Sequence, residues 1–140
     1  MTTRFRLTAI IPATPRQIYD AWLDSRGHRA MTGGKARQSA KIGAAFTAWD
    51  GYISGTNLEL VAGKRIVQAW RTTRFTAADK DSKITVTLKA MKSGTRVTLT
   101  HSGVPDGHTG YQDGGWQTHY FEPMQKYFAK PGTRRRAKRA

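Results

Sequence analysis

Histidine and carboxylate side chains are the groups in this sequence that could perform acid–base or metal chemistry. The histidines lack the H-x-x-x-H spacing of a metal-binding helix, and no neighbouring acids complete a ligand set; they are His28, His101, His108 and His119. Cysteine is absent, which excludes disulfides and thiolate chemistry and is typical of a cytoplasmic protein. We therefore expect neither a metal nor a cofactor.

Glu59 is the best-placed candidate for a general base. It stands between Leu58 and Leu60 in a predicted strand, so it should point to the face opposite theirs. If the leucines face outward, Glu59 points into the interior; the alternative is a solvent-exposed glutamate. Asp20 and Asp24 are expected to face solvent. Catalysis is the weakest of the functional hypotheses, and we favour a protein that is not an enzyme.

Nucleotide-binding and nucleophile motifs are missing from the sequence. Gly63-Lys64-Arg65 lacks both the upstream glycine and the Ser or Thr of a phosphate-binding loop. Gly33-Gly34 follows a helical stretch rather than a strand, which argues against a dinucleotide-binding turn, and no nucleophile elbow occurs. No apolar run approaches the roughly 18 residues that span a bilayer, so we expect no transmembrane segment.

The chain carries 24 Lys and Arg against 9 Asp and Glu, a net charge of +15. Part of this excess lies in the C-terminal tail, at Arg134, Arg135, Arg136, Lys138 and Arg139. We expect residues 1–130 to form a single domain and residues 131–140 to be disordered, because the tail has almost nothing to bury. Such a tail could bind nucleic acid or another anionic surface. The alternative, which we favour, is a solvated run of charge.

The pattern of apolar residues predicts an α+β domain. Alternation predicts a first strand over residues 4–11, and Thr14, Pro15 and Gln17 have the types and spacing of a capped helix start. A second short helix should end at Gly33-Gly34. The strands that follow are predicted at 36–42, at 44–55 with a turn at Asp50-Gly51, at 56–75 with a turn at 62–63, and at 82–104 with a turn at 93–94.

The segment GGWQTHYFEPMQKYF, residues 114–128, predicts a helix that covers this sheet. At about 100° per residue, one face collects Trp116, Tyr120, Phe121, Met124, Tyr127 and Phe128. Gln117 falls on the same face, where its amide would either contact a ligand or bind neighbouring backbone. Pro123 cannot donate a hydrogen bond to the carbonyl of His119, so we expect a kink there.

Large side chains from the strands and helices should meet beneath this helix. We expect a cavity lined by Trp22, Met31, Phe46, Trp49, Tyr52, Trp70, Phe75, Trp116, Gln117, Tyr120 and Met124. Glu59, Arg71 and His101 are the polar candidates for orienting a ligand. The alternative is that the same rings fill the interior and leave no pocket.

Three stretches together resemble one family: GTNLELVAGKRIVQAWR (55–71), GTRVTLTHSGVP (94–105) and GWQTHYFEPMQKYF (115–128). They are similar to the C-terminal domain of the activator of heat-shock protein 90 ATPase, a member of the SRPBCC superfamily of START and Bet v-like domains. The resemblance covers residues 5–129 and implies a helix-grip fold. In that fold a curved antiparallel sheet, here of about six or seven strands, wraps around a long C-terminal helix.

The resemblance, together with the aromatic inner face, supports two functional hypotheses. The first is non-enzymatic binding of a hydrophobic or aromatic small molecule, with a role in stress response. The alternative is a co-chaperone that binds heat-shock protein 90 and stimulates its ATPase. The 140 residues contain no counterpart of the N-terminal domain that the resemblance implies for clamping the chaperone, so we place ligand binding first. Single-domain members of this type suggest a homodimer.

Overall fold

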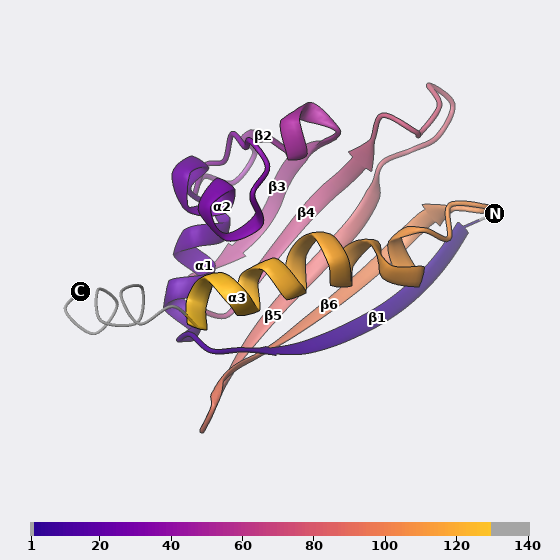
Figure 1. The fold of residues 1–140 in the computed structure, drawn as a ribbon. Helices are drawn as coiled ribbons and strands as arrows, with labels where there is room; N and C mark the ends of the chain where they lie inside the picture. Colours follow the sequence, from indigo (N-terminus) through magenta and orange to yellow (C-terminus); the bar gives the residue numbers. More distant parts are fainter. Residues whose placement is uncertain (1, 130–140) are drawn as a thin grey trace.

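The computed structural model describes residues 2–129, in which helices pack against one face of a curved sheet (Figure 1). In chain order the elements are β1 (Thr2–Ile11), α1 (Pro15–Trp22), α2 (Ser25–Thr32), β2 (Ala45–Ala48), the 3₁₀ turn η1 (Trp49–Gly51), β3 (Ile53–Val61), β4 (Arg65–Thr72), β5 (Ser82–Met91), β6 (Gly94–Pro105), the wide helical segments η2 (Tyr111–Gly115) and η3 (Gln117–Phe121), and α3 (Glu122–Ala129). This is the predicted α+β helix-grip fold. The predicted basic tail, 131–140, lies outside the described residues.

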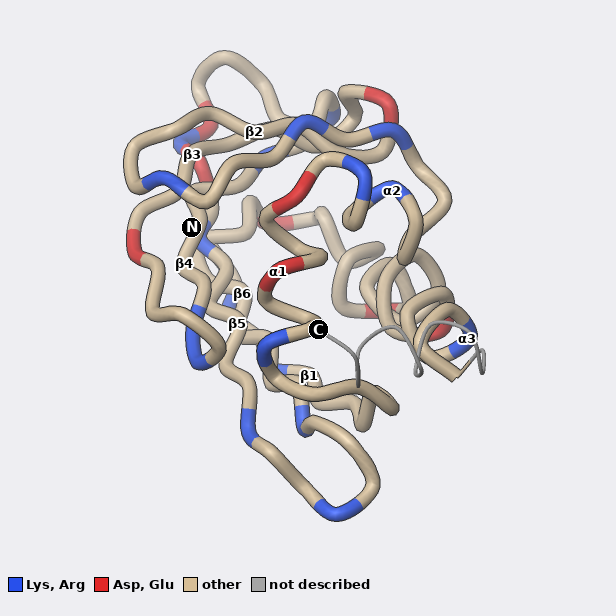
Figure 2. Tube along the Cα trace, turned by 90° about the vertical axis from the view of Figure 1, so that its left-hand side faces the viewer, with Lys and Arg blue, Asp and Glu red and all other residues tan. Residues whose placement is uncertain are grey.

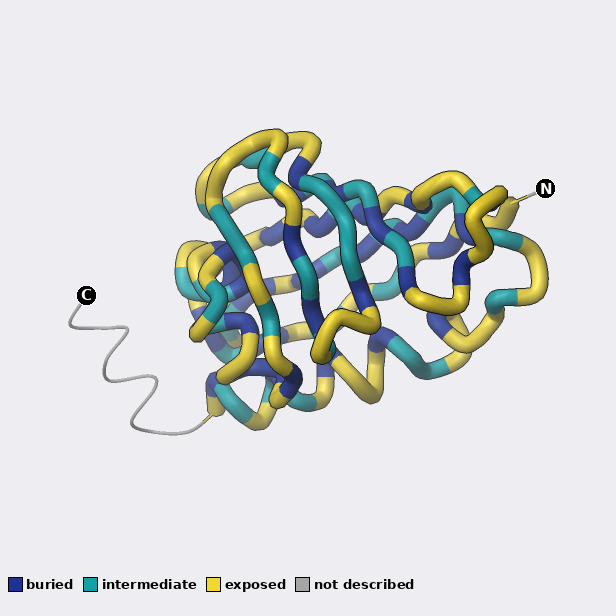
Figure 3. Tube along the Cα trace, turned by 90° about the horizontal axis from the view of Figure 1, so that it is seen from above, coloured by how far each residue is buried: buried dark blue, intermediate teal, exposed yellow. Residues whose placement is uncertain are grey.

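The sheet is antiparallel throughout, with its six strands in the order β1-β6-β5-β4-β3-β2. The two helices after β1 carry the chain to the far edge, from which it returns strand by strand until β6 pairs with β1. Buried and exposed residues alternate along the strands, as Figure 3 shows. In β5, for example, Ile84, Val86 and Leu88 face the interior.

The helical segments η2, η3 and α3 lie across the sheet in front of β5, β6 and β1 in Figure 1. They bury Phe121, Met124 and Phe128, each at most 3 % exposed. These side chains belong to one core cluster with Ile11 and Ile18, which are fully buried. The core therefore lies between the C-terminal helix and the inner face of the sheet.

The sequence predicts both short helices correctly. The Thr14 hydroxyl accepts a hydrogen bond from the Gln17 amide at 3.2 Å, and the Gln17 side chain accepts one from the Thr14 amide at 2.7 Å. This reciprocal pair is a capping box and fixes the start of α1. Gly33 ends α2 in the left-handed conformation, with a φ of 94°.

The strand predicted at 36–42 is wrong: this segment is a loop in which Arg37 makes an isolated bridge with Thr47. The side chain of Asn57 supplies hydrogen bonds that a neighbouring strand would otherwise make. The amide nitrogen of Asn57 donates to the carbonyls of Ser39 and Lys41, at 2.7 and 3.0 Å. Because these carbonyls are satisfied by Asn57, the loop needs no ladder of backbone hydrogen bonds at these positions.

The C-terminal helix begins at Tyr111, earlier than predicted, and its first turn is wider than that of an α-helix. The Trp116 amide donates to the Tyr111 carbonyl, and the Gly115 amide donates to the Gly110 carbonyl at 2.8 Å. Gly114 has a φ of 138°, a conformation that glycine adopts without steric cost. The glycine pair before Trp116 therefore shapes this turn.

A second wide turn precedes Pro123. The amide of Glu122 donates to the carbonyl of Gln117, five residues earlier. Pro123 has no amide hydrogen to donate to the carbonyl of His119, which removes one ordinary α-helical hydrogen bond at this place. The predicted disturbance at Pro123 thus takes the form of a widened turn directly before it.

The outer face of the sheet is basic and rich in threonine. Arg96 of β6 lies opposite Lys89 of β5, and Thr87 of β5 lies opposite Arg65 of β4. We use the name basic outer face for the exposed residues Arg4, Arg6, Arg65, Lys83, Lys89 and Arg96. Lys and Arg occur elsewhere on the folded domain as well (Figure 2). Within residues 2–129, no helix is long and apolar enough to cross a bilayer.

Candidate functional site

A pocket of about 380 Å³ lies where η2 and η3 pass the start of β3 and the end of β4. Its walls are formed by Trp49, Tyr52, Ile53, Trp70, Arg74, Gly110, Tyr111, Gly115, Trp116, His119 and Tyr120. Tyr52, Arg74, Gly110 and His119 are exposed and form the mouth of the pocket, whereas its floor is buried. None of the described residues that line it is Asp or Glu.

The floor consists of aromatic rings that pack against one another at angles from moderate to nearly perpendicular. Trp70 lies 5.4 Å from Trp116 and 5.1 Å from Tyr111 between ring centroids, the latter pair with their planes 87° apart. Tyr120 packs on Trp116 at 4.8 Å. Such rings are rigid and cannot bend into a gap as methionine does. Their packing therefore leaves space beside them.

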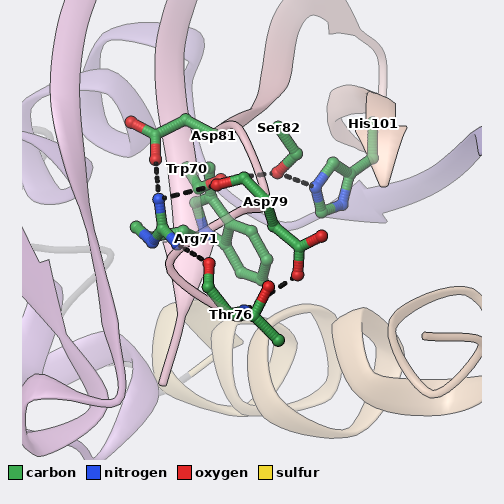
Figure 4. A network of polar contacts seen from close by, with 7 residues as sticks. All are labelled: Trp70, Arg71, Thr76, Asp79, Asp81, Ser82 and His101. Atoms are coloured by element: carbon green, nitrogen blue, oxygen red, sulfur yellow. Dashed lines mark hydrogen bonds and ion pairs between the residues drawn. The ribbon is translucent and has the colours of Figure 1, made fainter. Parts of the chain in front are cut away.

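Hydrogen bonds fix the orientation of Trp116 and of His101 next to it. The Trp116 indole N–H donates to Nδ1 of His101 at 3.2 Å. The Ser82 hydroxyl donates to the Trp70 carbonyl at 2.6 Å, so it accepts the hydrogen bond from Nε2–H of His101 at 2.8 Å (Figure 4). His101 is thus neutral, and burial lowers its pKa to about 3. With both nitrogens bonded inside the protein, His101 positions Trp116.

His28 performs the same task for Tyr120. The Trp22 carbonyl accepts a hydrogen bond from Nδ1–H of His28 at 2.9 Å, which leaves Nε2 to accept the Tyr120 hydroxyl hydrogen at 2.8 Å. Burial lowers the pKa of His28 to about 4 and raises the pKa of Tyr120. A residue of α2 therefore sets the direction of a ring in the pocket wall.

A further series of buried hydrogen bonds joins α1 to the sheet. The Trp22 indole N–H donates to the Gln68 side-chain oxygen at 3.2 Å, and the Gln68 amide nitrogen donates to Asn57 Oδ1 at 2.9 Å. Asn57 in turn holds the loop at residues 39–41. Trp22 also packs against Tyr120 at 5.1 Å. The floor of the pocket is thus held by fixed contacts from several elements.

The mouth of the pocket gathers polar groups around Tyr111. Its hydroxyl is hydrogen-bonded to that of Thr72 at 2.6 Å. Burial raises the pKa of Tyr111 to about 12, the hydrogen bond with Thr72 and the charge of Arg74 oppose this shift, and neighbouring Tyr52 adds to it. Tyr52 and Arg74 therefore lie close enough to Tyr111 to affect the pKa of its hydroxyl. Arg74 forms no ion pair with any residue between 2 and 129.

The predicted cavity residues divide into two groups. Five line the pocket, namely Trp49, Tyr52, Trp70, Trp116 and Tyr120. Five others are buried in the core away from it, namely Trp22, Met31, Phe46, Phe75 and Met124. The second group follows the alternative interpretation, in which large side chains fill the interior. Large side chains therefore fill one part of the interior and leave a pocket in another.

Gln117 does not line the pocket, and it is exposed rather than buried. The prediction assumed about 100° per residue along the whole helix. The wide turn η3 advances by a smaller angle per residue, so the buried face centres on Trp116 and Tyr120 and excludes Gln117. The prediction of a buried amide at this position is wrong.

A β-bulge turns Glu59 away from the interior. Asn57 lies opposite Gln68 in β4 and Glu59 lies opposite Val67, so Leu58 is an extra residue in β3. Alternation from the buried Asn57 would point Glu59 inward, but the bulge reverses it. Glu59 is exposed and accepts a hydrogen bond from Nε of Arg65 at 2.6 Å. The hypothesis that Glu59 is a general base inside the cavity is wrong.

Arg71 also lies outside the pocket, where it organises the β4–β5 loop (Figure 4). Its guanidinium donates to the Asp81 carboxylate at 2.8 Å, to the Thr76 carbonyl at 2.9 Å and to the Asp79 carbonyl at 3.3 Å. These acceptors leave it no role in orienting a ligand. The guanidinium at the mouth of the pocket belongs instead to Arg74.

Sequence reasoning missed the wall residues Ile53, Arg74, Gly110, Tyr111, Gly115 and His119. Tyr111 precedes Trp116 by five residues, a spacing that fits a wide helical turn but not an α-helical face. Arg74 follows the end of β4, where strand alternation no longer indicates direction. His119 packs against Trp49 at 5.2 Å, although its helix position is exposed.

The arrangement is suited to binding. Among residues 2–129, no three His, Asp or Glu side chains are grouped so that they could hold a metal ion. The pocket is lined by aromatic faces, tyrosine side chains, the His119 imidazole and one guanidinium. Small-molecule sites in proteins commonly combine apolar walls with a few polar groups of this kind.

Comparison with known proteins gives matches along almost the whole described chain. The sequence profile of the family "Activator of Hsp90 ATPase homolog 1-like protein" matches residues 12–129. The activator of 90 kDa heat shock protein ATPase homolog of Dictyostelium discoideum is 25 % identical over 129 residues, 91 % of this chain and 33 % of that protein. The human homolog 1 is 29 % identical over 129 residues, 91 % of this chain and 37 % of that protein. The chain thus spans about a third of the length of these relatives.

Solved structures show the same fold. An HSP90 activator from Plasmodium falciparum superposes with a TM-score of 0.80 at 23 % identity, covering 91 % of this chain and 97 % of the other. A Chromobacterium violaceum protein superposes with a TM-score of 0.71 at 25 % identity and the same coverage. The profile match over residues 12–129 shows that this chain belongs to the family of Activator of Hsp90 ATPase homolog 1-like proteins.

Proposed function

We propose that this protein binds an apolar, ring-bearing small molecule in the pocket between the C-terminal helix and the ends of β3 and β4, without transforming it. The pocket of about 380 Å³, with its floor of Trp70, Tyr111, Trp116 and Tyr120, carries this proposal. Its size lies within the range of small-molecule sites, roughly 300–1,000 Å³. The ring-lined floor favours flat or apolar ligands.

The rigidity of the floor supports binding rather than collapse. The polar tips of Trp116, Tyr120 and Tyr111 each have a hydrogen-bond partner inside the protein. Turning any of these rings into the empty space would break such a bond and leave a buried polar group unpaired, at a cost of about 1–3 kcal/mol. A guest can therefore enter a space whose shape already exists.

Occlusion at Gly110 tests this function. A Cβ atom at Gly110 would meet no heavy atom within 4 Å, and its φ of −59° suits any residue. Gly110→Phe should therefore fold and place a ring in the mouth of the pocket. Gly110→Ala is the matched control, because it changes the same backbone position but adds only a methyl group.

The probe is 1-aminoanthracene, a neutral fluorophore that brightens in apolar surroundings. Native protein and Gly110→Ala should bind it in a saturable way, and Gly110→Phe should bind it at least tenfold more weakly. Equal binding by Gly110→Phe and the native protein would remove the pocket as the site. Absence of saturable binding by all three would contradict the function itself.

Chaperone contact is the second candidate, favoured by the curated relatives, which are named as activators of the 90 kDa heat shock protein ATPase. The basic outer face could meet an acidic segment of such a partner, because opposite charge speeds and orients association. The ATPase rate of a 90 kDa heat shock protein, with and without this chain, tests the idea. Stimulation should be lost in Lys89→Glu/Arg96→Glu and retained in Gly110→Phe. An unchanged rate at saturating protein would dismiss this candidate.

A further inference from the structure

The polar groups of the pocket are distributed unevenly between its floor and its mouth. In the floor, the Trp116 indole and the Tyr120 hydroxyl donate to buried histidines. At the mouth, Arg74 has no acidic partner within residues 2–129, and none of the described wall residues carries a carboxylate. The one fixed charge of the pocket is therefore positive and uncompensated.

A buried donor in the pocket wall also lacks an acceptor. The indole Nε1 of Trp49 is buried and has no hydrogen-bond partner among the described residues. Buried donors of this kind are normally paired, since an unpaired one loses its water without compensation. Trp49 and Arg74 both belong to the wall of the same pocket. Because the Trp49 nitrogen is itself buried, the unpaired donor that a ligand can reach is the Arg74 guanidinium.

We propose that the ligand of this pocket is an aromatic or apolar monocarboxylate, whose carboxylate binds Arg74 at the mouth while its ring lies on Trp70 and Trp116. This inference rests on the proposed binding function and adds the chemical class of the ligand. A guanidinium presents paired N–H donors that match the two oxygens of a carboxylate. The hydroxyl of Tyr52, another residue of the mouth, supplies a further donor.

Nearby arginines differ from Arg74 in what they already bind. Arg71 is occupied by three oxygen acceptors of the β4–β5 loop, and Arg65 is paired with Glu59. Neither lines the pocket. Long-range attraction from the +15 chain would act on any anion, so the test must separate a local contact at Arg74 from the general charge.

The test compares 2-naphthoate with its neutral isostere 2-naphthamide, titrated directly by calorimetry. The proteins are the native chain, Arg74→Gln and Arg96→Gln. Arg96 is exposed on the outer face of the sheet, so its substitution removes the same charge at a distance from the pocket. In the native protein and in Arg96→Gln, naphthoate should bind about tenfold more tightly than naphthamide. In Arg74→Gln this preference should disappear, with naphthamide affinity unchanged.

A local readout accompanies the titration. In ¹H–¹⁵N spectra, naphthoate should shift the Nε–H signals of Arg74 and the indole signal of Trp49, and Arg74→Gln should reduce the Trp49 shift. Equal affinities for naphthoate and naphthamide in the native protein would overturn the assignment of an acidic ligand while leaving the apolar site in place. Loss of the preference in Arg96→Gln as well would trace it to general charge. No binding of either compound would end both proposals together.

Discussion

The space between the C-terminal helix and the sheet has two halves of different construction. In the closed half, Phe121, Met124 and Phe128 pack with aliphatic residues into a continuous core. In the open half, Tyr111, Trp116 and the other rings of the floor surround the pocket. Both halves are covered by the C-terminal helix and the same sheet, but the helix has wide turns over the open half and is a regular α-helix over much of the closed half.

Polar tips distinguish the rings of the open half. The Trp116 and Tyr111 tips are hydrogen-bonded to His101 and Thr72, whereas Phe121 and Met124 have no group that fixes their direction. Apolar side chains of the closed half can turn until the space is filled, as close packing requires. Rings with bonded tips cannot do so without breaking a bond. Around the pocket, the rings anchored at their ends leave the space unfilled.

The largest expected difference between the halves is in the cost of losing a ring. Phe121→Ala removes a side chain that is 1 % exposed, and it should lower the free energy of unfolding by about 3–5 kcal/mol. Tyr52→Ala at the mouth, where the side chain is 37 % exposed, should cost less than about 1 kcal/mol. Urea unfolding monitored by circular dichroism measures both. Similar losses would mean that the mouth is as tightly packed as the core.

Acidification should weaken the open half, because its two anchoring histidines are buried as neutral rings. His28 and His101 have pKa values of about 4 and about 3, both below the roughly 6.5 of an unfolded histidine. Below pH 6.5 the unfolded chain therefore binds more protons, and stability falls as the pH is lowered. We expect a loss of roughly 2–3 kcal/mol between pH 7.5 and 5.5. If the urea midpoint stayed constant over this interval, the conclusion that the fold holds both histidines in their neutral form would be wrong.

Removing a single anchor should give a smaller effect. Tyr120→Phe keeps the ring but deprives Nε2 of His28 of its donor, which should cost about 1–2 kcal/mol. Tyr127→Phe is the control, since the Tyr127 hydroxyl has no hydrogen-bond partner among the described residues, and it should change stability by less than about 0.5 kcal/mol. Thermal and urea unfolding measure the loss of stability in the two variants. Equal losses would mean that the hydrogen bond between Tyr120 and His28 does not stabilise the protein.

Two arginines three residues apart offer the mildest contrast. Arg71→Gln loses bonds to three loop oxygens on a partly exposed surface and should cost about 1 kcal/mol. Arg74→Gln loses no bond to another described side chain and should stay within about 0.5 kcal/mol of the native protein. A large destabilisation by Arg74→Gln would indicate that the charge of Arg74 stabilises the fold and is not reserved for a ligand.

Much of the fold was readable from the sequence because local signals determined it. Thr14 with Gln17, and Gly33 at the end of α2, specify their helix ends through bonds to nearby backbone. The strand pairs predicted at 56–75 and 82–104, with their turns, correspond to β3–β4 and β5–β6. The loop at 36–42 depends on Asn57, which is distant along the chain, and its polar pattern alone gave no sign of that.

The site was predicted less completely, because departures from regular geometry place its residues. The bulge at Leu58 reverses Glu59, and the widened turns of the helix exclude Gln117 while including Tyr111. A prediction that assumes regular strand alternation and a constant rotation of about 100° per helical residue cannot include either change. Aromatic residues such as Trp70 and Trp116 were found because size and apolarity alone put them inside.

The widened turns also bear on how the length of this protein can vary. Deleting one residue between positions 117 and 121 would restore an ordinary α-helical turn and leave Trp116 and Met124 seven residues apart. Because seven residues span about two α-helical turns, both side chains, which are buried now, would still face the sheet. Homologous sequences should therefore show one-residue deletions in this stretch more often than two-residue deletions, which would turn the flanking parts of the helix against each other by about 100°.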